Sequence, residues 1–124
     1  MHRSSLIAAV TVLAVGLVAL QYWNGSRPTP LPALARDLPQ DDPVKQSTVF
    51  RQRIAQRFPI GTPSADVERE LRAEGFQVKA KAGGWHAAMI ERRLYPCLLT
   101  WLVRWRSNAG KVVETTGGFQ PACP

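Results

Sequence analysis

The sequence has little of what catalysis or metal binding requires. It contains two cysteines, Cys97 and Cys123, and two histidines, His2 and His86, among 124 residues. Neither cysteine belongs to a CxxC pair or lies at metal-ligand spacing from a histidine. A glycine-rich phosphate loop, GxSxG, HExxH and a pair of carboxylates at helical spacing among apolar neighbours are also missing. These absences favour a protein that is not an enzyme and needs no cofactor or metal.

Acidic residues are scarce, and the chain is therefore basic. Sixteen Lys and Arg stand against nine Asp and Glu, giving a formal net charge of +7 at pH 7. This surplus favours polyanionic partners such as phosphates, lipid headgroups or nucleic acid, without identifying one. The length allows one small domain. The hydrophobic core of a domain this small usually needs a covalent cross-link such as a disulfide to be stable.

The first 23 residues contain one long apolar run. Every residue from Leu6 to Leu20 is apolar or small except Thr11, and Tyr22 and Trp23 follow as aromatic interfacial residues. As a helix, Leu6 to Trp23 would be about 27 Å long, close to the hydrocarbon thickness of a bilayer. We therefore predict a single-pass transmembrane signal anchor over residues 1–23.

A cleaved signal peptide is the alternative, because Arg3 gives the run a positive start. Cleavage needs small residues soon after the run, but bulky aromatic residues stand there and the Ala33 to Ala35 Ala-x-Ala lies well downstream. The positive-inside rule is nearly balanced between Arg3 and the pair Arg27 and Arg36. We place the N-terminus inside and predict an inner-membrane protein with its domain on the periplasmic side, where disulfides form.

Residues 24–42 are predicted to form a Pro-rich linker. Prolines at positions 28, 30, 32 and 39 and few bulky apolar residues are typical of an extended, semi-rigid spacer. A PxxP docking segment is the functional alternative.

Residues 43–124 are assigned to one small exported domain that begins with two helices. Asp42 and Pro43 form a helix start, and apolar residues then recur at helical spacing as far as Phe58. Thr62-Pro63 starts a second helix, which Gly75 closes. The basic residues on the other face of the first helix are interpreted as a solvated surface: Lys45, Arg51, Arg53 and Arg57.

After Phe76 the apolar residues follow a period of two, which predicts an antiparallel sheet. Strands are expected over residues 76–82, 85–95, 97–106 and 111–116, with a turn at 107–110. The expected fold is α+β. Two N-terminal helices pack on a small, three- to four-stranded antiparallel sheet, preceded by a single transmembrane helix and the Pro-rich linker.

The two cysteines are predicted to form a disulfide. A four-residue turn after Arg106 would place Cys97 opposite Gln120, three residues before Cys123. Closing a loop of that length stabilises a fold by about 3.5 kcal/mol on the chain-entropy model. The alternative is a reactive thiol at Cys97 with His86 as its base, but no third residue is placed to orient that base.

A series of motifs resembles a known family. The run Phe58-Pro59-Ile60-Gly61-Thr62 precedes Val67, Leu71, Gly75-Phe76, Cys97, Trp101, Trp105, Gly110 and Cys123. Over about residues 45–120 this order resembles the outer-membrane assembly lipoproteins called SmpA/OmlA or BamE-like. The chain departs from that family in lacking a lipidation cysteine after the apolar run. The resemblance implies the fold and a role as a protein-interaction module of the cell envelope.

Four arginines are the predicted binding residues: Arg92, Arg93, Arg104 and Arg106. Arg104 and Arg106 alternate along one strand with Trp101 and Trp105, which we assign to the core. With Arg92 or Arg93 from a neighbouring strand, they could form a basic sheet face suited to carboxylate or phosphate groups. A solvated sheet face is the alternative.

We therefore expect an interaction or scaffolding domain of the cell envelope, which meets a protein partner through the free sheet face or a sheet edge. The alternative is a binder of anionic envelope lipid or cell-wall polymer through the basic face. No nucleic acid partner is expected, because the aromatic residues are assigned to the core rather than to a stacking platform. Nucleic acid becomes the alternative if the orientation is reversed.

Overall fold

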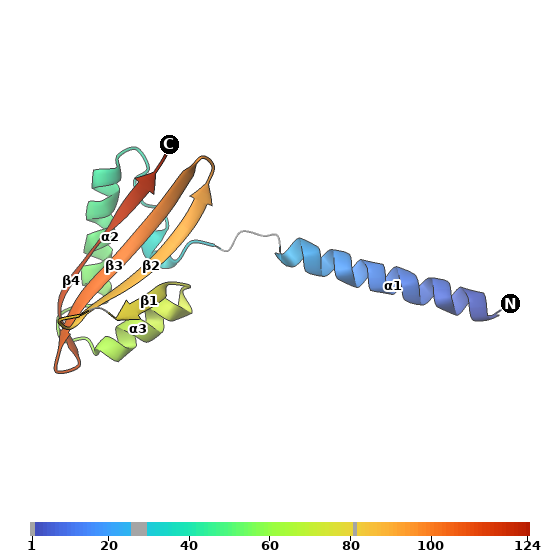
Figure 1. The fold of residues 1–124 in the computed structure, drawn as a ribbon, viewed down its shortest axis with the longest axis horizontal. Coiled ribbons are helices and arrows are strands. Elements are labelled where there is room, and N and C mark those ends of the chain that lie inside the picture. Colours follow the sequence, from blue (N-terminus) through green and yellow to red (C-terminus); the bar gives the residue numbers. More distant parts are fainter. Residues whose placement is uncertain (1, 26–29, 81) are drawn as a thin grey trace. The chain divides into compact units, whose positions relative to one another are not determined.

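The protein is described by a computed structural model that covers residues 2–25, 30–80 and 82–124, with side chains for residues 9–23, 25, 30–79 and 82–124. The chain divides into two compact units, Met1–Pro30 and Leu31–Pro124. The first contains helix α1 (His2–Gly25) (Figure 1). The second contains η1 (Ala33–Ala35), α2 (Pro43–Arg57), α3 (Ser64–Ala73), β1 (Gln77–Ala80), β2 (Trp85–Leu94), β3 (Cys97–Asn108) and β4 (Lys111–Ala122).

The apolar run is helical, but the predicted membrane crossing is not supported. Across the residues that the structure describes, no helix combines the length and the apolar character that a bilayer requires. The predicted transmembrane anchor is therefore wrong for the described residues, and so is the predicted single-pass inner-membrane localisation.

Part of the segment expected to be an extended linker belongs to the core. Leu34, Ala35 and Leu38 are at most 5% exposed. Arg53 on α2 donates hydrogen bonds to the backbone carbonyl groups of residues 33, 34, 36 and 37. The compact unit therefore begins at Leu31, earlier than the expected start at residue 43.

The two predicted helices of the domain are present. The Asp42 carboxylate accepts a hydrogen bond of 2.9 Å from the backbone N–H of Val44, which satisfies a free donor at the start of α2. Phe50 and Ile54 on α2 are fully buried, as are Val67 and Leu71 on α3. Each helix therefore turns one apolar face toward a common core.

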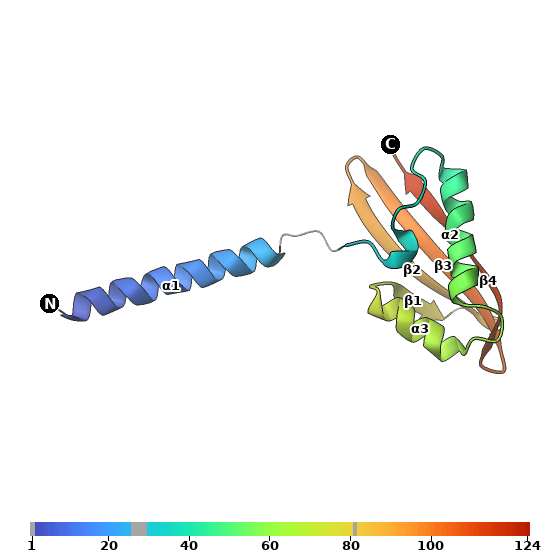
Figure 2. The same ribbon diagram turned by 180° about the vertical axis from the view of Figure 1, so that it is seen from behind.

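The four strands form one antiparallel sheet in the order β1-β2-β3-β4. Trp101, Val103 and Trp105 alternate along β3 and are at most 3% exposed, which confirms the core assignment of both tryptophans. Helix α2 packs against β4, and α3 against β1. Figure 2 shows α2 in front of the strands, and Figure 1 shows the opposite sheet face without a helix of this unit over it.

The structure thus shows an α+β fold with a four-stranded antiparallel sheet, but the predicted fold class is wrong in two respects. The described residues include no transmembrane helix. Helical structure is also not confined to an N-terminal pair, because the helical turn η1 precedes α2 and α3 in the compact unit. Leu34 and Leu38 are four residues apart, but the helical turn in this segment covers only Ala33–Ala35, and the burial of both leucines therefore depends on tertiary packing.

The predicted register of the last hairpin is wrong by three residues, whereas the predicted disulfide is confirmed. Arg106 pairs with Glu114 rather than Lys111, because Ala109 and Gly110 form a two-residue turn at positive φ and Val113 is an extra residue in β4. The shift brings Cys97 directly opposite Cys123. Their Cα atoms are 4.2 Å apart, and the two residues form a disulfide.

Helix α2 approaches β4 closely at Gly117. A Cβ atom there would lie 2.6 Å from Cδ1 of Ile54 and would also collide with the carbonyl oxygen of Leu102. Two residues further along, the Ser47 hydroxyl accepts a hydrogen bond of 3.0 Å from the N–H of Phe119 and donates one of 3.1 Å to its carbonyl. Helix α2 therefore caps the outer edge of β4 at this point.

We predict that Gly117→Ala lowers the free energy of unfolding by about 1–3 kcal/mol, because the added methyl group overpacks the contact with Ile54. Gly118→Ala is the matched control, since its Cβ would meet only the Ser47 hydroxyl at 3.7 Å. Urea denaturation of both variants measures the difference. Equal stability of the two variants would contradict the close contact at Gly117.

We also predict that replacing Cys97 and Cys123 together with alanine lowers the free energy of unfolding by about 3.5 kcal/mol, because the unfolded chain gains conformational freedom. The measurement is urea denaturation of this variant and the wild type, without reductant. With excess reductant, the two proteins should become nearly equal. A difference that persists after reduction would assign the loss to side-chain packing instead.

Candidate functional site

The sheet face opposite α2 is the candidate site. Because Trp101, Val103 and Trp105 point toward the helix, Thr100 and Leu102 on β3 point the other way. Their register partners bring Gln120 and Gly118 of β4 to the same face. These side chains lie on a rigid sheet that is backed by the core.

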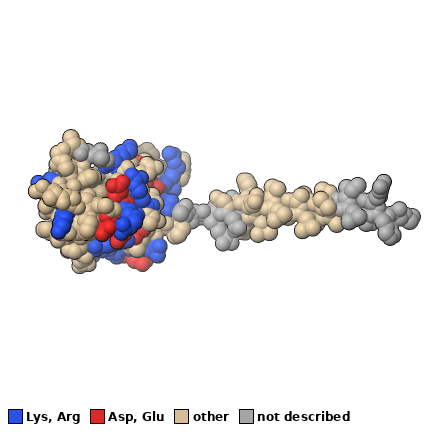
Figure 3. All heavy atoms as spheres, turned by 90° about the horizontal axis from the view of Figure 1, so that it is seen from below, with Lys and Arg blue, Asp and Glu red and all other residues tan. Residues whose placement is uncertain are grey.

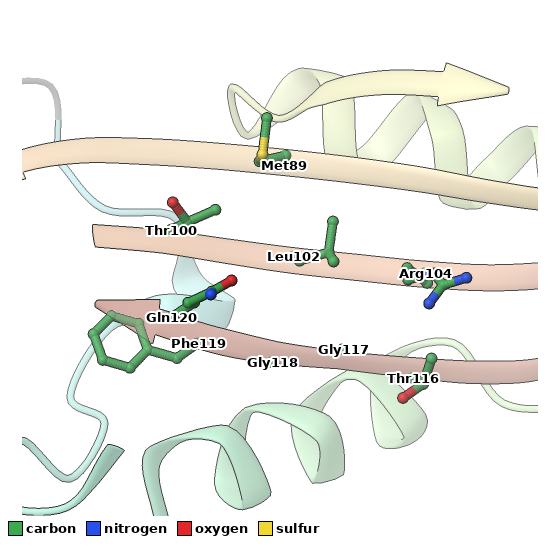
Figure 4. A pocket seen from close by; sticks show the side chains of 9 residues that line it. All are labelled: Met89, Thr100, Leu102, Arg104, Thr116, Gly117, Gly118, Phe119 and Gln120. Carbon is green, nitrogen blue, oxygen red and sulfur yellow. The ribbon is translucent and has the colours of Figure 1, made fainter. Parts of the chain in front are cut away.

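This face is hollowed beside the second glycine of β4. The hollow has a volume of about 420 Å³. It is lined by Met89, Thr100, Leu102, Arg104, Thr116, Gly117, Gly118, Phe119 and Gln120, and Figure 4 shows how they lie on three neighbouring strands. Gly118 pairs with Leu102 and carries no side chain, so the surface falls inward between Thr116 and Gln120. The hollow is therefore a consequence of the glycine pair in β4.

The lining combines an apolar floor with polar groups around it. Met89 and Leu102 supply thioether and aliphatic surface, and both are half-buried. Thr100, Thr116 and Gln120 supply hydroxyl and amide groups. Such a combination suits an apolar side chain accompanied by hydrogen-bonding groups.

One end of the hollow carries a positive charge. The guanidinium carbon of Arg104 lies 5.1 Å from the centre of the Trp85 ring, in a cation–π contact. The Nε atom of Arg104 is buried and has no hydrogen-bond partner among the described residues. Arg104 is also the one ionisable residue among the described residues that line the hollow.

The structure does not bring the four predicted binding arginines into one patch. Arg104 and Arg106 share a sheet face, but Arg106 forms an ion pair of 3.3 Å with Glu114. Arg93 pairs with Leu98, toward the other end of β3. Arg92 alternates with Arg93 and therefore lies on the same side of β2 as Ile90. Ligand binding by these arginines stays a prediction.

The basic residues of α2 were interpreted as a solvated surface, but two of them have structural contacts. Arg53 binds the carbonyl groups around η1. Arg57 forms ion pairs with Glu70 and Glu74, which tie α2 to α3. Figure 3 shows acidic and basic side chains mixed on the underside of the domain. The net positive charge is therefore not concentrated there.

The reactive-thiol alternative is excluded by the disulfide, because neither cysteine is free. His86 instead stacks on Trp105, with ring centroids 5.0 Å apart. Its Nε2 atom lies 3.0 Å from the Ser107 hydroxyl. His86 therefore has a packing role. Among the described residues, no group of three His, Cys, Asp or Glu side chains is placed to hold a metal ion.

Sequence reasoning missed most of the hollow. The last strand was expected to end at residue 116, whereas Gly117 and Gly118 lie within β4. Extending the alternation of β4 through both glycines would have placed Thr116 and Gln120 on the face of Leu102. The alternation of residues along β4 was therefore the sequence signal that could have located the hollow.

No protein-family model matches the chain, and neither a curated protein nor a solved structure matches it. The resemblance to the SmpA/OmlA family is therefore carried by the sequence motifs alone.

Proposed function

We propose that the compact unit is a protein-interaction domain that binds a partner over the uncovered face of its sheet, at the Gly118 hollow. The observation that carries this proposal is a hollow of about 420 Å³ on a sheet whose other face is packed by α2. The half-buried Met89 and Leu102 at its floor provide the apolar centre that protein interfaces share. The threonine and glutamine side chains provide a polar rim.

The rigidity of this face supports the proposal. The strands below the hollow are held by the buried tryptophans of β3 and by the close contact of α2 with Gly117. A surface that is already ordered loses little conformational entropy when a partner binds. The hollow therefore favours binding without a rearrangement of the sheet.

The outer edge of β4 is a weaker candidate than the face. Ser47 occupies both backbone groups of Phe119. The backbone of Val112 is bonded to Gly61 and Thr62 from the loop between α2 and α3. Pro121 lacks an N–H donor. A partner strand would therefore lose several of the hydrogen bonds on which strand addition depends.

A binding role is favoured over a catalytic one by the chemistry of the lining. Arginine stays protonated at all physiological pH values and cannot act as a general base. The other lining side chains are thioether, hydroxyl, amide or hydrocarbon groups. An anion-binding basic face has less support than a protein site, because Arg106 is paired with Glu114 and Arg93 lies toward the far end of the sheet.

We predict that a photo-crosslinking amino acid at position 120 captures a discrete partner in intact cells, because Gln120 lines the hollow. The same amino acid at position 52, an exposed residue of α2, is the positional control. Gly118→Val fills the hollow and should lower the yield on the order of tenfold, as expected for the loss of a central contact. Gel electrophoresis and mass spectrometry measure the product.

Urea denaturation should first establish that Gly118→Val is as stable as the wild type. Equal yields from positions 120 and 52 would contradict a specific site on this face. So would a yield that Gly118→Val leaves unchanged.

A further inference from the structure

Arg104 is distinguished from its neighbours by the absence of a counter-ion. Arg106, two residues along β3, is paired with Glu114, and Arg57 is paired with Glu70 and Glu74. Arg104 forms no ion pair or hydrogen bond with any described residue, and its Nε is shielded from solvent. A cation in this position gains more from a bound carboxylate than an exposed cation does.

The guanidinium is also held in place. It lies over the indole of Trp85 at 5.1 Å from the ring centre, which restricts the plane of its N–H groups. Thr116 pairs with Arg104 across the strands and also lines the hollow. Arg104 and Thr116 together form a polar subsite at one end of the hollow (Figure 4).

The next pair along the same face forms an apolar subsite. Leu102 pairs with Gly118, and Met89 pairs with Leu102 from the other side. Two residues along a strand correspond to about 6.6–6.8 Å, so the polar and apolar subsites are separated by about that distance. An extended peptide has the same spacing between side chains at positions i and i+2, which point to one side.

We propose that the occupant of the hollow is an extended segment of a partner protein that carries an apolar side chain and a carboxylate two positions apart. This inference rests on the proposed function. The apolar side chain fills the hollow over Gly118, and the carboxylate accepts hydrogen bonds from Arg104. No Asp or Glu is among the described residues that line the hollow, so the partner supplies the negative charge.

A single unpaired arginine fits one carboxylate better than it fits a membrane or polymer surface. Retention on an anionic surface usually depends on a cluster of several basic residues. Here the adjacent Arg106 is neutralised by Glu114. The uncharged remainder of the hollow suits a peptide side chain.

The test uses the full chain and a fluorescein-labelled, C-amidated peptide of sequence Ala-Leu-Thr-Glu-Ala. Fluorescence anisotropy should give saturable binding that weakens at least about tenfold when Gln replaces Glu in the peptide, because the charge-assisted hydrogen bonds are lost. Arg104→Gln should weaken the Glu peptide by a similar factor. Arg104→Lys keeps the positive charge but loses the two parallel N–H donors of the guanidinium. Its Kd for the Glu peptide should therefore lie between those of the wild type and Arg104→Gln. Arg106→Gln is the matched control and should change the Kd by less than about twofold.

Several outcomes would overturn the inference. One is no binding of the Glu peptide at millimolar concentration, and another is a Kd that neither Arg104→Gln nor the Gln peptide changes. If Gly118→Val abolishes binding in that second case, the proposed function stands and only the carboxylate assignment fails. If Gly118→Val also leaves the Kd unchanged, both the proposed function and the carboxylate assignment fail. Retention on phosphatidylglycerol vesicles that depends on Arg104, without peptide binding, would assign the site to an anionic surface instead.

Discussion

The close approach of α2 to β4 is the constraint on which the rest of the domain depends. Only a residue without a side chain leaves room for Ile54 above Gly117. This contact lets Phe50 and Ile54 reach the tryptophans of β3 and seals one side of the sheet. It also brings Ser47 to the edge of β4, where a side chain satisfies backbone groups that an unprotected strand would offer to another chain.

Because one side of the sheet is fully packed, the roles of the charged residues follow from the side on which they lie. Arg53 and Arg57 hold elements of the packed side together through carbonyl and carboxylate groups. On the uncovered side, Arg106 has Glu114 and Arg104 has only an aromatic ring. In this basic protein, Arg104 at the hollow therefore has no acidic partner among the described residues.

Local patterns in the sequence were sufficient for the elements whose determinants are local. Asp42 and Pro43 mark the start of α2, and the alternation around Trp101 and Trp105 marks β3. The register of β3 with β4 was not accessible in this way, since it depends on a tight turn and on the extra residue Val113. The burial of Leu34 and Leu38 depends on contacts with α2, and the hollow depends on a glycine pair whose place in a strand is set by the partner strand.

The attachment of η1 to α2 has a mechanical consequence. Arg53 binds several carbonyl groups of the segment that enters the compact unit, and Leu34 and Leu38 of that segment are buried. Tension applied to the chain ahead of Leu31 would meet these contacts before it reached the sheet. The contacts between this segment and α2 would thus break first under tension, while the hollow on the opposite face of the sheet keeps its shape.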